Sequence, residues 1–355
     1  MVPFNGLAAR LGHADVAPPF DLTVAALMGN RMKNLGNSNP SPKTWRKPLR
    51  EAMTWIPGGV FTMGSDDHYP EERPARRVSV DGFWIDPSPV TNRQFGQFAN
   101  ATGYVTFAEL PPDPNDYPGA DPALLVASSM VFTPPRGVVD LRHPLQWWAF
   151  VQGANWRRPY GPGSDLQGLG DHPVVHVAWV DVLAYAAWAG VEIPTEAEWE
   201  LAARGGLEGV EYAWGDTFLQ DDRHMANTWQ GAFPHQNTLD DGWARTSPVG
   251  AYPPNGYGLH DMISNTWEWT ADWWSTPDVA GAAPRCCAAK NPRGGLEESS
   301  CEAGGLPIPR KVLKGGSHLC APSYCKRYRP AARHAQPIDT SASHVGFRCI
   351  VRSRA

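Results

Sequence analysis

The chain has 355 residues, of which 42% are hydrophobic and 19% charged, and its formal net charge is −5. That balance excludes a general nucleic-acid binder, which would carry a basic surplus, and no apolar run reaches the ~18–20 residues that span a membrane. The 35 glycines, 35 prolines and 16 tryptophans indicate a loop-rich fold whose irregular segments are held by buried indoles.

The N-terminal part differs from the rest of the chain. Residues 1–50 are predicted to form a flexible extension, helical at most over residues 21–28. Asp21 precedes the apolar stretch where a signal peptide would have a basic region, and the six cysteines suggest no disulfide framework. We therefore expect a cytoplasmic protein. Residues 51–355 are predicted to form one compact, mixed α+β domain.

Short strands open this domain. Residues 55–64 predict a first strand and turn, and residues 76–80 and 83–86 predict a hairpin around the Asp81-Gly82 turn. Residues 110–145 are rich in proline and lack periodicity, so we expect a long ordered loop there.

Three helices are indicated by their end signals. Thr91 is an N-cap for a helix that stops at Gly103. Residues 179–189 have apolar side chains at helical spacing, with Gly190 beyond the end. Residues 195–198, Thr-Glu-Ala-Glu, form a capping box for a third helix that ends at the Gly205-Gly206 pair.

The second half of the domain shows less regular structure. Beyond residue 206 the chain predicts mostly turns until Val312, with an exposed excursion over residues 276–310. Residues 346–351 predict a closing strand. His172 and His176 are expected on one face of a strand, as hydrogen-bonded core histidines rather than metal ligands.

The most informative feature is a pair of cysteines, Cys320 and Cys325, in a glycine-rich, basic and aromatic segment. Thiolates are soft metal ligands and nucleophiles, and the basic residues at 326, 327 and 329 would favour the thiolate. The spacing alone is equally compatible with buried thiols or a local disulfide. A structural zinc would need two further ligands, and neither His318 nor His334 completes a familiar zinc spacing.

Oxygen-rich turns form a second group of candidates. Residues 261–268, Asp-Met-Ile-Ser-Asn-Thr-Trp-Glu, could bind calcium, which takes six to eight oxygen ligands. A solvated turn with Trp267 buried is the simpler interpretation of these residues alone. Asn227 and Asp241 present the same alternatives.

Several longer segments resemble those of the formylglycine-generating enzymes. They are residues 315–333 and 343–349, with residues 56–64, 153–157, 172–177, 193–200, 254–259 and 265–270. Most of these segments are common to a wider superfamily that includes ergothioneine sulfoxide synthases and catalytically silent paralogues. Within that superfamily, the Cys320/Cys325 pair resembles the formylglycine generators in particular, and the chain resembles those of prokaryotic type.

The resemblance implies a fold, an activity and a cofactor. The fold would be the loop-rich domain of formylglycine-generating enzymes, which is similar to C-type lectins. The activity would be the O₂-dependent oxidation of a cysteine in Cys-x-Pro-x-Arg segments of nascent or unfolded sulfatases to Cα-formylglycine. Cys320 and Cys325 would hold Cu(I), and Ser317 and Tyr324 would orient the substrate sulfur or the oxygen species.

The resemblance also implies two structural calcium sites. Each set combines side-chain oxygens with backbone carbonyls. The first set is Asn227, Thr228, Asp241 and Trp243, and the second is Asp261, Ser264, Thr266 and Glu268.

The chain departs from its secreted animal relatives at their disulfides. The expected partner positions are Ala186, Ala203 and Pro330, which leaves Cys349 alone and supports a cytoplasmic enzyme of prokaryotic type. The composition, separately, predicts neither membrane nor nucleic-acid partners. His344 replaces a residue that is often asparagine near the active site. Residues 276–310 have no role that the resemblance supplies.

Two other functions stay open from the sequence. A catalytically silent sulfatase-binding paralogue would lack the cysteine pair. A non-haem iron sulfoxide synthase would need a histidine cluster on an N-terminal helical domain, whereas residues 1–50 contain a single histidine, His13.

Overall fold

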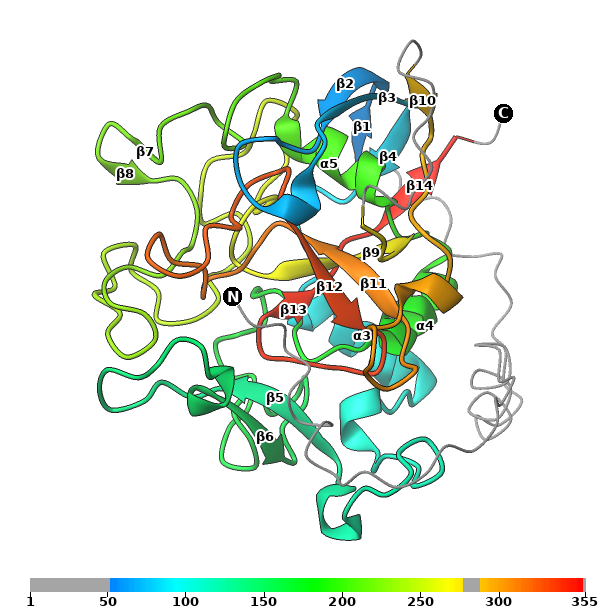
Figure 1. Ribbon diagram of the computed structural model, residues 1–355, viewed down its shortest axis with the longest axis vertical. Coiled ribbons are helices and arrows are strands. Elements are labelled where there is room, and N and C mark those ends of the chain that lie inside the picture. Colours follow the sequence, from blue (N-terminus) through cyan, green and yellow to red (C-terminus); the bar gives the residue numbers. More distant parts are fainter. Residues whose placement is uncertain (1–51, 277–287, 354–355) are drawn as a thin grey trace.

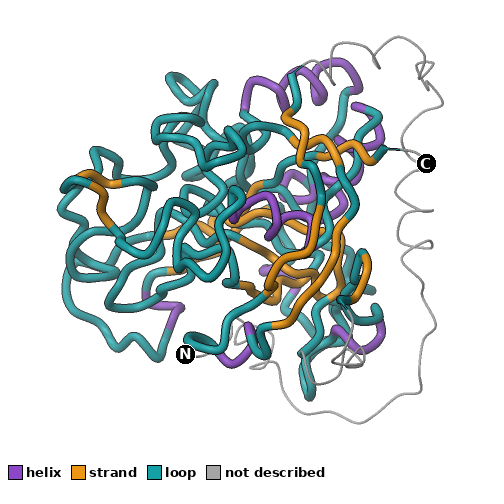
Figure 2. Tube along the Cα trace, turned by 90° about the horizontal axis from the view of Figure 1, so that it is seen from above, coloured by secondary structure: helices purple, strands orange, loops and turns teal. Residues whose placement is uncertain are grey.

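The computed structural model describes residues 52–276 and 288–353, so the predicted extension at 1–50 lies outside the described residues. Helices are few, and loops connect most elements (Figures 1 and 2). The α-helices in this part of the chain are α3 (Asn92–Thr102), α4 (Trp179–Ala189) and α5 (Glu196–Arg204). Within the same ranges, no helix has the length and apolar character to cross a bilayer.

The strands of the described residues form three larger sheets and two short ribbons. One sheet has the order β1 (Thr54–Ile56), β4 (Phe83–Ile85), β14 (Ile350–Arg352), and a second has β10 (Ala289–Lys290), β3 (Arg76–Val80), β2 (Gly59–Met63). The largest has the order β12 (Arg333–Pro337), β11 (Arg310–Lys314), β9 (Trp267–Trp273), β13 (Val345–Gly346). The ribbons pair β5 (Ser128–Phe132) with β6 (Trp148–Gln152) and β7 (Leu219–Gln220) with β8 (Arg223–His224).

The predicted helices are confirmed, and their caps explain why they start and stop where they do. In α3, Thr91 and Gln94 form a reciprocal capping box, in which the Thr91 N–H donates to Gln94 Oε1 at 2.8 Å. Thr195 and Glu198 do the same for α5, with 2.7 Å between the Thr195 N–H and Glu198 Oε2. Each helix then ends at a glycine in the left-handed region, as the end signals predicted.

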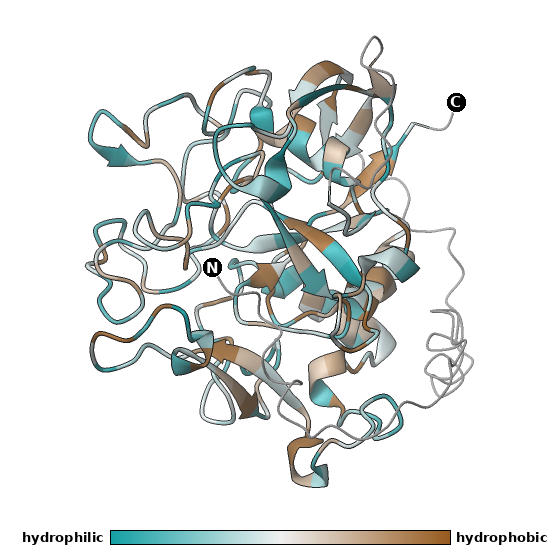
Figure 3. Cartoon of the chain, viewed as in Figure 1, coloured by the Kyte–Doolittle hydropathy of each residue, from teal (hydrophilic) through white to brown (hydrophobic). Residues whose placement is uncertain are grey.

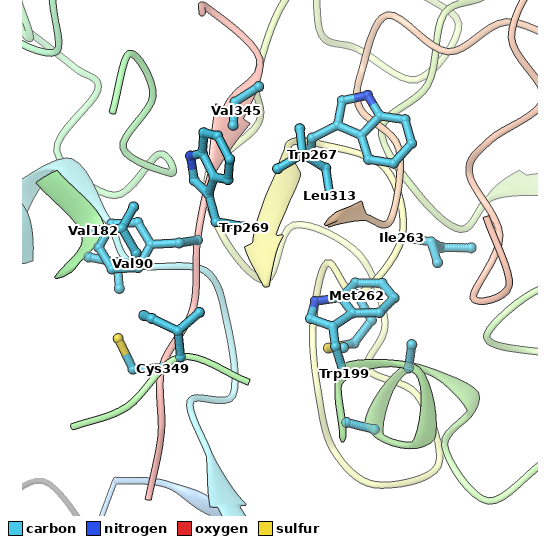
Figure 4. Packing of buried hydrophobic residues seen from close by; sticks show 14 of the residues in the cluster. Val90, Val182, Trp199, Met262, Ile263, Trp267, Trp269, Leu313, Val345 and Cys349 are labelled. Carbon is cyan, nitrogen blue, oxygen red and sulfur yellow. The ribbon is translucent and has the colours of Figure 1, made fainter. Parts of the chain in front are cut away.

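The core is packed around β9, between β11 and β13. Trp269 is fully buried, and its indole N–H donates to the carbonyl of Val177 at 3.0 Å. Figure 4 shows Trp199 of α5, Met262 and Leu313 of β11 in the same cluster. Apolar and polar residues share strands: β11 is hydrophobic in its middle and hydrophilic toward its ends (Figure 3), a pattern that places charges next to the core.

The predicted hairpin around Asp81-Gly82 is wrong. β3 pairs with β2 and β10, whereas β4 pairs with β1 and β14, so the chain changes sheets at this turn. The connection between β1 and β2, which contains Gly58, packs directly against this turn. A Cβ on Gly58 would lie 2.6 Å from the Val80 carbonyl, and one on Gly82 would lie 2.5 Å from the Trp55 ring. The glycines therefore serve this crossing rather than a two-residue hairpin.

Other expectations also need correction. The predicted loop over residues 110–145 contains the strand β5. The region after residue 206 contains β9, one of the two inner strands of the largest sheet, and residues 288–310 are partly ordered because β10 pairs with β3. The closing strand is split into β13 and β14, which join different sheets. His172 and His176 are not on a strand, since His176 has φ +62°, but both are hydrogen-bonded as expected.

Candidate functional site

The loop that carries Cys320 and Cys325 begins at the end of β11, next to a buried group of ion pairs. Lys314, the last residue of β11, is fully buried, and its Nζ lies 2.9 Å from Glu200 and 3.5 Å from Glu196 of α5. Glu200 is also paired with Arg204 at 2.7 Å. Because a buried charge without its partner costs several kcal/mol, these pairs fix the point at which the loop begins.

Two glycines turn the chain sharply at this point. Gly315 and Gly316 have φ values of +96° and +76°, which favour glycine. A Cβ on Gly316 would lie 2.7 Å from the carbonyl oxygen of Arg327. The start and end of the loop can therefore lie in direct contact, which closes the loop around its two cysteines.

Two short turns bring the thiols face to face. The Cys320 N–H donates to the Ser317 carbonyl at 2.8 Å, and the Cys325 N–H donates to the Ala321 carbonyl at 2.9 Å. The two Sγ atoms are 3.3 Å apart, well beyond the ~2.05 Å of a disulfide, and both cysteines are free. Cys320 is 2% exposed and Cys325 is half-buried, so solvent reaches one member of the pair.

The two sulfurs are electrostatically unequal. A hydrogen bond from the Cys320 thiol lowers the pKa of Cys325 to about 7, against the effect of burial and with help from the Arg327 guanidinium, whose Nη1 is 4.0 Å from the sulfur. Burial raises the pKa of Cys320 well above its ordinary value. Of the two, Cys325 therefore forms the thiolate more readily, and that thiolate accepts a hydrogen bond from the Cys320 thiol.

Ser317 and Tyr324 lie on the same loop as the cysteines. The Ser317 N–H donates to Cys320 Sγ at 3.4 Å. The Tyr324 ring stacks on Phe233 with 4.5 Å between centroids and meets the edge of Trp147 at 5.6 Å. Burial raises the pKa of Tyr324 to about 12, so its hydroxyl stays protonated and can donate a hydrogen bond.

Residues 69–72, distant in the sequence, bind the end of this loop, and that contact was not predicted from the sequence. The single 3₁₀ turn η2 (Pro70–Glu72) and the preceding Tyr69 contact the residues after Cys325. Arg327 pairs with Glu71 and lies 3.9 Å above the Tyr69 ring. Arg329 pairs with Glu72, and both side chains are almost fully buried. The acidic pair at 71–72 is the only signal in the sequence, and no spacing rule relates residues 256 positions apart.

The structure brings the first predicted calcium set together. Asp241 accepts hydrogen bonds from the N–H groups of Thr228 at 3.1 Å and Trp243 at 3.0 Å. Asn227 donates to the carbonyl of Arg245 at 2.8 Å, while its buried Oδ1 has no partner among the described residues. A buried oxygen without a donor fits a cation ligand, so Asn227 could bind calcium here, whereas the carbonyl of Thr228 already accepts a hydrogen bond from the Gln230 side chain.

The second set is only partly available. Ser264 Oγ and Thr266 Oγ1 are buried and lack partners in the described part of the chain, and Asp261 accepts from the Gly250 N–H at 2.8 Å. Glu268, in contrast, is engaged: Arg348 donates to it at 2.7 and 2.8 Å, and the Trp199 indole N–H at 2.7 Å. Glu268 serves here as the buried counter-ion of Arg348.

His344 lies at the far end of a group of aromatic rings that begins at Tyr324. Its ring is 4.6 Å from Trp148, which contacts Phe132, which in turn contacts Phe233. His344, which was predicted to lie near the active site, is thus connected to the cysteine loop through packed aromatic rings.

The donor atoms at the cysteine pair suit a soft ion. Across residues 52–276 and 288–353, no three histidine, cysteine or acidic side chains are grouped as a metal site. Structural zinc takes four such ligands, whereas Cu(I) favours soft sulfur. Two free thiols 3.3 Å apart therefore fit copper better than zinc.

Comparisons with known proteins agree with this loop and fold. A family model described as a sulfatase-modifying factor enzyme 1-like domain matches residues 39–353. The formylglycine-generating enzyme of Mycobacterium tuberculosis is 51% identical over 296 residues, which cover 83% of this chain and 96% of the relative. That of Thermomonospora curvata is 45% identical over 317 residues, covering 87% and 96%.

Among solved structures, PvdO from Pseudomonas aeruginosa has a TM-score of 0.55 and 24% identity, and the match covers 85% of this chain and 94% of PvdO. That likeness shows the fold alone. The molecule is a loop-rich α+β domain with a paired-thiol loop, and the predicted fold class is confirmed. The matching family model and relatives show that the chain belongs to the formylglycine-generating enzyme family, as the sequence resemblance indicated.

Proposed function

We propose that this protein converts a cysteine of a sulfatase polypeptide into Cα-formylglycine. The observation that carries the proposal is the pair of free thiols of Cys320 and Cys325, 3.3 Å apart, on the loop that closes at Gly316 and Arg327. The names of the relatives supply the reaction, and the thiol pair supplies a site that could perform it.

The finer proposal concerns substrate and oxidant. We expect a Cys-x-Pro-x-Arg segment in an unfolded polypeptide, with O₂ as electron acceptor. O₂ takes two electrons from the substrate cysteine and two from a thiol reductant. Both oxygen atoms of O₂ become water, and the thiol reductant leaves as a disulfide. The oxidised cysteine, a thioaldehyde, is hydrolysed by one water to the aldehyde, and its sulfur leaves as H₂S.

The residues of the loop have separate tasks in this reaction. Cys320 and Cys325 would hold Cu(I), which when bound supplies the one-electron and O₂ chemistry that amino-acid side chains lack. Cys325 is the half-buried member of the pair, so a substrate thiol would reach it more easily than the buried Cys320. The protonated hydroxyl of Tyr324 and the buried hydroxyl of Ser317 would orient the substrate sulfur.

Calcium would have a structural role, with Asn227, Thr228, Asp241 and Trp243 as the better site. A chelator that removes calcium should lower the melting temperature, and added Ca²⁺ should restore it. Asn227→Ala should abolish that response, because it removes the unpartnered buried oxygen.

The test of activity uses the full chain loaded with Cu(I), in air, with a thiol reductant. A peptide containing Cys-x-Pro-x-Arg should lose sulfur and gain an aldehyde, as seen by mass spectrometry. A peptide with serine in place of the cysteine should not react. If the cysteine peptide is also left intact, the proposed function is wrong.

Two variants locate the reaction. Cys320→Ser or Cys325→Ser should abolish conversion, whereas Cys349→Ser, which changes another buried free cysteine, should retain it. Metal analysis of the purified protein should find copper at the cysteine pair. Iron without copper would favour a sulfoxide synthase, and full activity of both serine variants at the pair would rule out a dithiolate centre.

A further inference from the structure

The residues around Cys325 show a feature that the proposed reaction does not yet use. Arg327 places Nη1 4.0 Å from the Cys325 sulfur, and its guanidinium lies 3.9 Å above the Tyr69 ring. It is also paired with Glu71. Three groups from two parts of the chain, residues 69–71 and the cysteine loop itself, thus determine where this one positive charge lies.

The backbone on either side of Arg327 is fixed as well. The N–H of Lys326 donates to the Tyr69 hydroxyl at 3.0 Å, and Arg329 pairs with the buried Glu72. The carbonyl of Arg327 packs against Gly316, where a Cβ would come within 2.7 Å. The guanidinium therefore has little freedom to leave the sulfur.

A Cu(I) dithiolate would be negatively charged, and a positive group at the position of Arg327 would stabilise it. One Cu⁺ and two thiolates carry a net charge of −1, and a third thiolate from a substrate would raise this to −2. A negative charge in a mostly buried loop is costly unless a positive group lies close to it. The side chain of Lys326, the neighbouring basic residue, is instead 40% exposed and is paired with Glu211 at 2.7 Å.

We propose that Arg327 is a positioning residue that balances the charge of the metal-bound thiolates, and that Tyr69 and Glu71 hold it in place for that task. The inference rests on the proposed function, since it assumes Cu(I) at the cysteine pair. It assigns a role in the active site to a segment some 250 residues away in the chain, η2 and Tyr69.

The test measures Cu(I) affinity by competition with a colorimetric Cu(I) chelator, without substrate. At a separation of about 4 Å, loss of the positive charge in Arg327→Gln should weaken binding by at least about tenfold. Arg327→Lys should recover part of the affinity, because it keeps the charge without the planar stack on Tyr69. Lys326→Gln is the matched control and should bind Cu(I) like the unaltered chain.

A double variant separates charge from structure. Arg327→Gln leaves Glu71 without its partner, whereas Arg327→Gln/Glu71→Gln removes both charges of the pair. If the weaker Cu(I) binding persists in the double variant while the melting temperature recovers, the charge acts on the thiolates. If affinity recovers together with the melting temperature, the role of Arg327 is structural and the inference is overturned.

The remaining outcomes are also distinct. Equal Cu(I) affinity of Arg327→Gln and the unaltered chain would overturn the inference and leave the proposed function standing. Equal losses of Cu(I) affinity in Arg327→Gln and Lys326→Gln would overturn the inference, because they would show that any nearby positive charge stabilises the thiolates equally. An unaltered chain that binds no Cu(I) would overturn the copper part of the proposed function, and this inference with it.

Discussion

The regions around Cys325 and Cys349 contain two buried or half-buried free thiols in opposite environments. Cys325 lies beside the Cys320 thiol and Arg327, which lower its pKa. Cys349 is 1% exposed, and its N–H donates to the Asp86 carboxylate at 3.1 Å; burial and the acidic neighbours raise its pKa well above the ordinary value. Neighbouring groups, a hydrogen-bond donor and a cation at Cys325 but carboxylates at Cys349, thus act in addition to burial and decide which of these two thiols forms a thiolate more readily.

The largest expected effect comes from releasing the end of the Cys325 loop. Arg329→Met should lower the free energy of unfolding by about 3–5 kcal/mol, because Glu72 would be buried without a partner. Urea unfolding followed by fluorescence measures this loss.

An exposed ion pair provides the control for that variant. Arg93 pairs with Asp171 at 2.9 Å, but both side chains are more than half exposed, so Arg93→Met should cost less than about 1 kcal/mol. Arg329→Met/Glu72→Leu should regain much of the lost stability. Similar losses for Arg93→Met and Arg329→Met would mean that η2 does not anchor the loop.

The Cys349 region should respond to pH through Asp86. Burial raises the pKa of Asp86 from 3.8 to about 7, so the folded state binds its proton more tightly than the unfolded chain. Its contribution to stability is fully present below about pH 4 and is lost as the pH rises through 7. Relative to the unaltered protein, Asp86→Asn should therefore gain up to about 4 kcal/mol between pH 4 and 8.

This comparison is made by measuring unfolding of both proteins at each pH. Titration of the buried histidines is common to both and cancels in the difference. Two stability curves that stay parallel between pH 4 and 8 would show that Asp86 does not titrate in this range.

Alkylation compares the two thiols directly. In the metal-free, reduced protein near pH 7.5, iodoacetamide should modify Cys325 about a hundredfold faster than Cys349, because the thiolate reacts and only Cys325 forms it readily. The Cys325 rate should fall as the pH drops below 7. Peptide-level mass spectrometry resolves the two sites, and comparable rates would contradict the electrostatic contrast.

The smallest effect concerns the aromatic side of the Cys325 loop. Phe233→Leu removes the stack on Tyr324 at 4.5 Å and should cost about 1 kcal/mol of stability. Alkylation of Cys325 should become somewhat faster as the loop loosens, with no change at Cys349. A change at Cys349 instead would indicate a global loss of structure.

Local signals made some of this structure predictable. The helices α3 and α5 follow from Thr91 with Gln94, and from Thr195 with Glu198, because a capping box satisfies amides within one turn of chain. The cysteine pair was also evident, since its two members and the basic flank lie in one segment. Its geometry, with the sulfurs 3.3 Å apart, required the structure.

Long-range contacts explain what the sequence could not reveal. Residues 267–273 fell within the region predicted to be mostly turns, yet they form β9, which is largely buried between two strands. Glu268 was assigned to calcium, and only the fold reveals Arg348 beside it. The grip of Glu71 and Glu72 on Arg327 and Arg329 likewise joins segments that no periodic pattern connects.

The pairing of β4 has a consequence for how the protein is made. Ile85 pairs with Thr54 of β1 on one side and with Ile350 of β14 on the other, so the first and last described strands belong to one sheet (Figure 1). During synthesis β1 and β4 can pair early, but their sheet is complete only once β14 has been made. The loop with Cys320 and Cys325 is also synthesised late, and it is held by contacts with η2, which is synthesised early. The two cysteines are therefore held in their observed arrangement only after both segments, residues 69–72 and 325–329, have been made.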